Sequence, residues 1–217
     1  MESVPAVMES VLANNCCLSL SRARQVVPRS DEIDHLIPID SLSLFSTGVS
    51  DAGIAYLTTL MSLKHLNIDS RLVTDTSLGH IANLTGLEHL DLFGTNVTED
   101  GTRSLASLTR LKVLEMCGGN ITDSAVQHMS TLTCLETLNI SQNEGVTGVS
   151  ILVLRRFSLL RSLNLAGTMV CSESICGLTL LTNLSSLCLS GCRVNAATLR
   201  VLEAMPQMMY LTAEPKP

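Results

Sequence analysis

The stretch LEHLDLFGTNVTEDGTRSLASLTR, residues 87–110, decides the fold, because its aliphatic framework recurs along most of the chain. Each copy opens with the pattern L-x-x-L-x-L or a close variant of it. Successive copies begin at a constant interval, except that the step from Leu135 to Leu160 is longer by a single residue. The copies begin at Ile39, Leu63, Leu87, Leu111, Leu135, Leu160, Leu184 and Met208. A fixed period of this length predicts a solenoid of stacked repeats.

Each unit predicts a strand, a turn and a short helix. In residues 87–110, Leu90 and Leu92 alternate with His89 and Asp91, so the leucines face a core and the polar pair faces the opposite side of a sheet. A hydroxyl residue followed by an acid marks the helix start at Ser50-Asp51, Thr74-Asp75, Thr98-Glu99 and Thr122-Asp123. We expect each hydroxyl to cap its helix and each acid to favour the positive helix end.

The repeat predicts one continuous array over residues 39–217, because each coil contacts only its neighbours. Residues 1–38 are expected to form an N-terminal helix and a degenerate first repeat. Leu18 and Leu20 lie one repeat period before Leu42 and Leu44, which supports that extra coil.

Composition excludes several classes of function. The net charge of −6 and the lack of a basic block argue against binding to a nucleic-acid backbone. No signal peptide is visible, and no apolar run approaches the roughly 18 residues that a membrane span needs. The eight cysteines form no C-x-x-C pair, so we interpret them as reduced thiols of a cytoplasmic protein.

No catalytic motif is present, and the chain is expected to be neither an enzyme nor a cofactor-binding protein. His65 and His89 are predicted to be neighbours on adjacent strands, near Asp69 and Asp91, which raises a metal-binding hypothesis. A flat, solvated face without supporting groups makes a poor metal site. A pair of surface histidines with no metal is therefore the preferred interpretation.

The pattern resembles the leucine-rich repeat family, in its 24-residue, cysteine-containing-like subclass. That subclass follows L-x-x-L-x-L-x-x-[CTN]-x-[VI]-T-D-x-G, and residues 87–101 fit it well, while Cys192 supplies the cysteine variant. The resemblance implies an α/β fold: a right-handed solenoid, shaped as an arc, with a parallel concave sheet of about 8–9 strands and short convex helices. The chain also resembles the repeats of F-box proteins, although residues 1–38 contain no clear F-box.

Framework residues are buried in such a fold, so the alternating positions carry the information about partners. These positions form columns across the coils, and the first half of the array concentrates charged and aromatic residues there. The candidate partner-binding residues are Phe45, His65, Asn67, Asp69, His89, Asp91, Phe93 and Glu115. Exposed phenylalanines beside acids favour a protein partner with a basic segment.

The sequence therefore predicts a protein-interaction scaffold that binds on its concave face. Two alternatives remain open: a substrate-recruiting adaptor of a ubiquitin ligase, and a surface or secreted recognition protein. Five N-x-[ST] triplets fit the second alternative, but the repeat pattern itself generates them. The last strand, near Met208, Met209 and Tyr210, leaves an open edge at which self-association is predicted.

Overall fold

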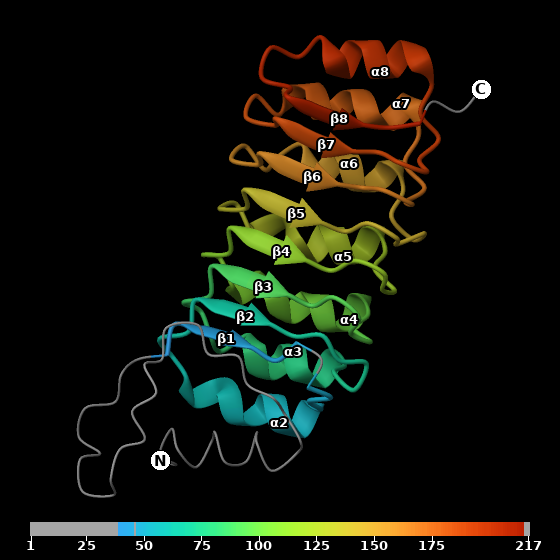
Figure 1. The fold of residues 1–217 in the computed structure, drawn as a ribbon. Coiled ribbons are helices and arrows are strands. Elements are labelled where there is room, and N and C mark those ends of the chain that lie inside the picture. Colours follow the sequence, from blue (N-terminus) through green and yellow to red (C-terminus); the bar gives the residue numbers. More distant parts are fainter. Residues whose placement is uncertain (1–38, 46, 215–217) are drawn as a thin grey trace, which may run out of the picture.

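The computed structural model describes residues 39–45 and 47–214, which form one stack of coils (Figure 1). The N-terminal helix and degenerate repeat predicted for residues 1–38 lie outside the described residues. Within them, eight parallel strands form one sheet in the order of the sequence. These are β1 (Ser41–Ser43), β2 (His65–Asn67), β3 (His89–Asp91), β4 (Val113–Glu115), β5 (Thr137–Asn139), β6 (Ser162–Asn164), β7 (Ser186–Cys188) and β8 (Tyr210–Thr212).

Short helices cover the back of this sheet, which gives the molecule two layers (Figure 1). The α-helices are α2 (Asp51–Ala55), α3 (Asp75–Ile81), α4 (Glu99–Thr102), α5 (Asp123–His128), α6 (Gly148–Leu154), α7 (Ser172–Ile175) and α8 (Ala196–Glu203). Four continue as 3-10 turns: η1 (Tyr56–Thr59), η2 (Arg103–Ser107), η3 (Met129–Thr131) and η4 (Cys176–Leu180). A 3-10 helix has three residues per turn, which accounts for apolar residues spaced three apart.

The predicted register is confirmed. Leu66 pairs with Leu90, Leu90 with Leu114, and Leu114 with Leu138, and all four side chains are buried. The longer step between Leu135 and Leu160 leaves this register intact, because Thr137 pairs with Ser162 across it. One aliphatic core therefore runs along the described stack.

The prediction for the helix starts was right only in part. The hydroxyls of Thr74 and Thr98 do accept hydrogen bonds from the first turns of α3 and α4. Ser50 and Thr122 make no such cap, so the prediction was wrong at these two residues. The Thr122 hydroxyl donates instead to the Glu99 carboxylate of the preceding coil.

The acids at these starts link neighbouring coils. Asp75 accepts hydrogen bonds from the amide and the hydroxyl of Thr98, both at 2.7 Å. Asp123 makes the same pair of bonds with Thr147, at 2.9 and 2.6 Å. Each of these two carboxylates thus joins its own coil to the next one, in addition to lying near a helix N-terminus.

Candidate functional site

A shallow hollow of about 230 Å³ lies on the sheet face across β1 to β4. Leu42, Leu66 and Leu90 are among its lining residues. Five predicted site residues also line it: His65, Asn67, His89, Asp91 and Glu115. The strand register brings them together, because His65 pairs with His89 and Asp91 with Glu115.

The two histidines form a contact pair at one side of the hollow. Their ring centroids lie 4.3 Å apart with an angle of 38° between the ring planes. Burial lowers the pKa of His89, and the neighbouring His65 lowers it further. The His89 imidazole is therefore held toward its neutral form, which offers a flat ring surface rather than a positive charge.

Asn67 and Asp91 form a hydrogen-bonded pair across β2 and β3. The Asn67 Nδ2 donates to Asp91 Oδ2 at 2.7 Å, and the Phe93 amide donates to Asp91 Oδ1 at 2.9 Å. The Asn67 Oδ1 is buried and has no hydrogen-bond donor. The two hydrogen bonds fix the position of the Asp91 carboxylate in the hollow. The Asn67 Oδ1 beside it is a buried acceptor without a donor, and burial of such a group is energetically unfavourable.

Within the described residues, no cationic side chain forms a salt bridge with the Asp91 carboxylate. Burial raises its pKa, the Phe93 amide opposes that rise, and the nearby Glu115 and Asp69 add to it. In the described part of the chain, none of these three acids takes part in a salt bridge. A positively charged group entering the hollow would relieve this repulsion.

Two ion pairs lie in the row of residues that precede the strands. Lys112 Nζ pairs with Glu88 Oε2 at 2.6 Å, and Arg161 Nε pairs with Glu136 Oε2 at 3.3 Å. These four residues occupy the positions that precede the strands, where acids and bases alternate from coil to coil. Lys112 and Arg161 thus pair with acids of this row, and neither pairs with Asp91 or Glu115 within the described residues.

The other three predicted site residues lie outside the lining of the hollow. Phe45 and Phe93 are 58% and 47% exposed, so both rings are accessible to a partner. Asp69 occupies the equivalent position in the coil between them, and its Oδ1 would be 2.5 Å from a Cβ atom placed on Gly94. Gly94 also has a φ of +68°, so both space and backbone favour glycine at this turn.

Three lining residues were missed in selecting candidates from the sequence. Ser41, Ser43 and Val113 belong to the same columns as the predicted residues but carry neither charge nor an aromatic ring. Their position in the repeat was the available signal. Selecting residues only by charge or by an aromatic ring therefore misses small and aliphatic side chains that line a hollow.

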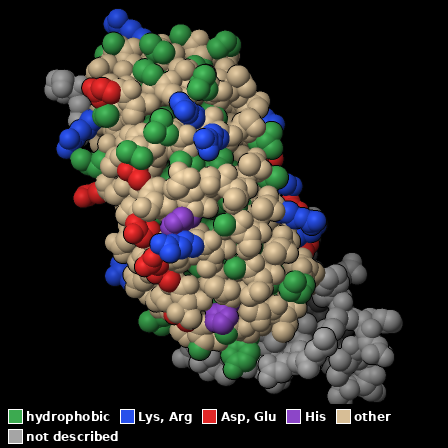
Figure 2. Space-filling view, turned by 180° about the vertical axis from the view of Figure 1, so that it is seen from behind, with side chains coloured by type: hydrophobic (Ala, Val, Ile, Leu, Met, Phe, Trp, Pro, Cys, Tyr) green, Lys and Arg blue, Asp and Glu red, His purple; other side chains and the backbone are tan. Residues whose placement is uncertain are grey.

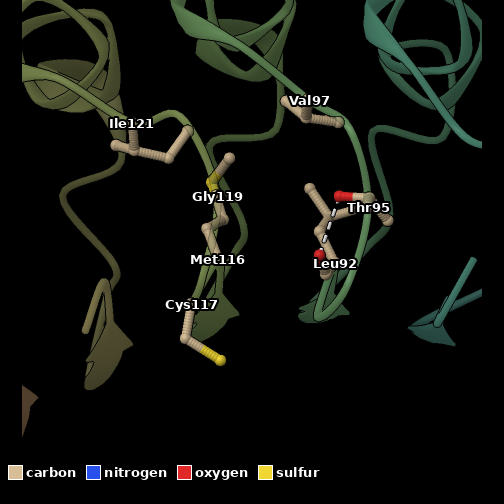
Figure 3. A pocket seen from close by; sticks show the side chains of 7 residues that line it. All are labelled: Leu92, Thr95, Val97, Met116, Cys117, Gly119 and Ile121. Atoms are coloured by element: carbon tan, nitrogen blue, oxygen red, sulfur yellow. Dashed lines mark hydrogen bonds between the residues drawn. The ribbon is translucent and has the colours of Figure 1, made fainter. Parts of the chain in front are cut away.

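A second, much smaller hollow of about 10 Å³ lies in the turns that follow β3 and β4 (Figure 3). Its lining includes Leu92, Met116 and Gly119, and the Thr95 hydroxyl beside it donates to the Leu92 carbonyl at 2.8 Å. This volume holds one water molecule at most. Gly119, which lines the small hollow, supplies no side chain where the two neighbouring coils carry Thr95 and Asn143.

Two of the described cysteines have thiols whose protonated form is favoured by burial. Burial raises the pKa of Cys117 and of Cys192, so neither thiol is held as a thiolate. Cys192 is buried in the turn and donates to the Leu165 carbonyl, which indicates a structural role. Across residues 39–45 and 47–214, no three His, Cys, Asp or Glu side chains are grouped as a metal site. No helix in the same residues has the length and apolarity required to cross a bilayer.

Comparison with known proteins places the chain in a family. The family model of a leucine-rich repeat region matches residues 16–216. Among solved structures, internalin C2 of Listeria monocytogenes is similar with a TM-score of 0.65 and 24% identity, over 81% of each chain. A second Listeria monocytogenes internalin, inlF, has a TM-score of 0.61 and 23% identity, over 80% of this chain and 54% of its own. No curated protein matches the chain. These solved structures share the stacked-coil fold, and the match to the family model over most of the sequence shows that the chain belongs to the leucine-rich repeat family.

Proposed function

We propose that this protein is a binding scaffold whose concave face receives a basic segment of another protein at the hollow between β1 and β4. Membership of the leucine-rich repeat family supports a protein-interaction scaffold in general. The observation that carries the finer proposal is the Asp91 carboxylate, which is half-buried beside Glu115 and has no basic side chain paired with it in the described residues.

The geometry suits an arginine or lysine side chain flanked by apolar residues. A guanidinium group can donate several hydrogen bonds in one plane, which suits carboxylates on neighbouring strands. The His65–His89 pair offers a ring surface beside them, and the exposed Phe45 and Phe93 offer apolar contact outside the hollow. Contact residues of this kind carry most of the affinity in protein interfaces.

The test uses two libraries of peptides, one rich in arginine and lysine and one rich in acids, with fluorescence anisotropy against the full chain. We expect binding only from the basic library. The double substitution Asp91→Asn/Glu115→Gln should weaken it by at least about tenfold, equivalent to roughly 1.4 kcal/mol. The matched control is Asp100→Asn, which removes an exposed acid from α4. Equal affinity of the double variant and the wild type would refute the proposal.

A cytoplasmic location remains part of this proposal. The six cysteines that the structure describes are all free, as expected in a reducing compartment. A count of reactive thiols on protein isolated from its native source tests it. Oxidised cysteines in that material would favour the secreted alternative.

The exposed edge of β8 supports a second candidate role, self-association. Met209 and Tyr210 are 71% and 66% exposed, and β8 pairs only with β7 in the described sheet. A second copy could add a strand to this edge. Substitution of both side chains by lysine, followed by measurement of the molar mass in solution, tests that role.

A further inference from the structure

Aliphatic side chains face solvent on the helical side of the last coils. Val149 and Leu152 of α6 are 60% and 55% exposed, and Leu180 and Val201 of the next two coils are 64% and 50% exposed. Cys176, at the start of η4, is exposed between them. Figure 2 shows apolar side chains gathered on this face at the C-terminal end, with basic side chains among them. We name Val149, Leu152, Cys176, Leu180 and Val201 the convex patch.

The repeat provides its own comparison for these positions. The residues that occupy the positions of Val149 and Leu152 one coil earlier are Ser124 and Gln127, and two coils earlier Asp100 and Arg103. Thr131 and Ser107 occupy the position of Leu180 in those same coils. The fold therefore accepts polar residues here, and packing does not require the aliphatic ones. Exposed aliphatic groups that the fold does not need point to an interaction surface.

Unpaired charges of both signs surround the convex patch. Arg155, Arg156 and Arg200 are exposed, and so are Glu173 and Glu203. None of these five side chains takes part in a salt bridge within residues 39–45 and 47–214. Such a surface is complementary to a second copy of itself. In a two-fold interface, the apolar centres of the two copies pack together, and each arginine of one copy can face a glutamate of the other.

We propose that the convex patch is the interface of a homodimer, formed by a second copy of this chain related by two-fold symmetry. Cys176 lies in the middle coil of the patch, since η4 contacts both α6 and α8. A two-fold axis through the middle of the patch brings Cys176 of each copy close to its symmetry mate. The concave hollows of both copies remain open in this arrangement, so the dimer is independent of the function proposed above and would present two binding faces.

Sedimentation equilibrium of the full chain over a range of concentrations tests the dimer. We expect a species of twice the 23.3 kDa chain mass. The substitution Leu152→Glu/Leu180→Glu should raise the dimer dissociation constant by at least about tenfold, because dimerisation would then bury carboxylates without a partner in the interface. The matched control is Gln127→Glu/Thr131→Glu, which places the same charges at the same repeat positions one and two coils away; it should leave the dissociation constant unchanged. Circular dichroism checks that each variant is folded.

Cross-linking at Cys176 locates the axis. A short bismaleimide, which adds to thiols without oxidation, should give a covalent dimer that the Cys176→Ser variant does not form. A chain that is monomeric at all concentrations overturns the inference. A dimer that resists Leu152→Glu/Leu180→Glu but is lost on Met209→Lys/Tyr210→Lys also overturns it, and assigns self-association to the β8 edge instead.

Discussion

The Asp51 carboxylate accepts hydrogen bonds from the amide and the hydroxyl of Thr74, at 2.8 and 2.7 Å, one coil further along the stack. The Ser77 hydroxyl donates to the same carboxylate. Asp75 and Asp123 make equivalent bonds in later coils, and the series ends where Gly148 replaces the acid. We call Asp51, Asp75 and Asp123 the inter-coil aspartates. They hold the starts of α2, α3 and α5 against the start of the next helix, and Glu99 takes this place at the start of α4.

Removal of one inter-coil aspartate should destabilise the array. Asp123→Ala leaves the Thr147 amide and the hydroxyls of Thr147 and Ser150 without their acceptor, and we expect a loss of about 1–3 kcal/mol in the free energy of unfolding. Urea denaturation measures it. Asp100→Ala is the control, because its carboxylate is exposed and makes only a 3.7 Å ion pair with Arg103. Equal losses in both variants would contradict the role of the inter-coil aspartates.

The same carboxylates should make the array sensitive to acid. Burial acts to raise the pKa of Asp51 and of Asp123, but hydrogen bonds from Ser77 and Thr74, and from Ser150 and Thr147, lower it below 3.8 in both cases. The folded state therefore binds fewer protons than the unfolded state. The stability from these groups is present above pH 3.8 and is lost as the pH falls through their folded pKa.

Urea denaturation at about pH 6 and at about pH 3 tests this dependence. The variant Asp51→Asn/Asp123→Asn should lose less stability than the wild type between the two pH values. Asp91→Asn should behave in the opposite way, because burial raises the pKa of Asp91 and its carboxylate weakens the folded state above that pKa. A pH profile of the double variant that coincides with the wild type would rule out the inter-coil aspartates as its source.

Asn143 should be the most sensitive polar residue of the interior. Its Nδ2 donates to the Met116 and Ile140 carbonyls, both at 2.9 Å, and its Oδ1 accepts from the Ile121 amide. It thereby serves its own coil and the preceding one, where Gly119 has no side chain. We expect Asn143→Ala to cost roughly 3 kcal/mol in thermal or urea denaturation, since several buried groups lose their partners. Asn120→Ala, at an exposed position, should cost far less.

Two adjacent glycines should respond to alanine in opposite directions. Gly118 has a φ of +71°, so Gly118→Ala forces a side chain into the left-handed region and should destabilise the fold by about 1 kcal/mol. At Gly119 the nearest atom to an added Cβ is Asn143 Oδ1 at 3.6 Å, and φ is not in that region. Gly119→Ala should therefore stabilise the fold by about 0.4–1 kcal/mol through the unfolded state. Melting temperatures of both variants decide this, and a shift in the same direction for both would be contrary to it.

Binding of a basic segment should weaken as the pH falls. Burial lowers the pKa of His89 and raises the pKa of Asp91, and both groups gain a proton as the pH falls. Protonation of His89 adds a repelling charge, and protonation of Asp91 removes an attracting one. Titration of a basic peptide at several pH values measures the effect. The Asp91→Asn/His89→Gln variant should show a flatter profile, and unchanged pH dependence would exclude these two groups.

Much of the candidate site was predictable because a side chain in a strand has only two faces. The spacing of Leu66 and Leu90 put both in the core, and so put His65, Asn67, His89 and Asp91 on the opposite face, as adjacent neighbours. Polar character in the columns then indicated where a partner could bind. The participation of Ser41 and Val113 in the hollow was not predictable, since neither residue type signals a site.

The sequence by itself determined the repeat, the register of the strands and the division of residues between core and surface, because a constant period places equivalent residues next to each other. Only the tertiary structure decided which polar groups bond to each other. The Asp51 carboxylate accepts from Thr74 of the next coil, in addition to lying at the start of its own helix. The Asn67 amide donates to Asp91, while the Asn67 Oδ1 has no hydrogen-bond donor. Such choices depend on side-chain rotamers and on the distance between coils, and a one-dimensional pattern fixes neither of them.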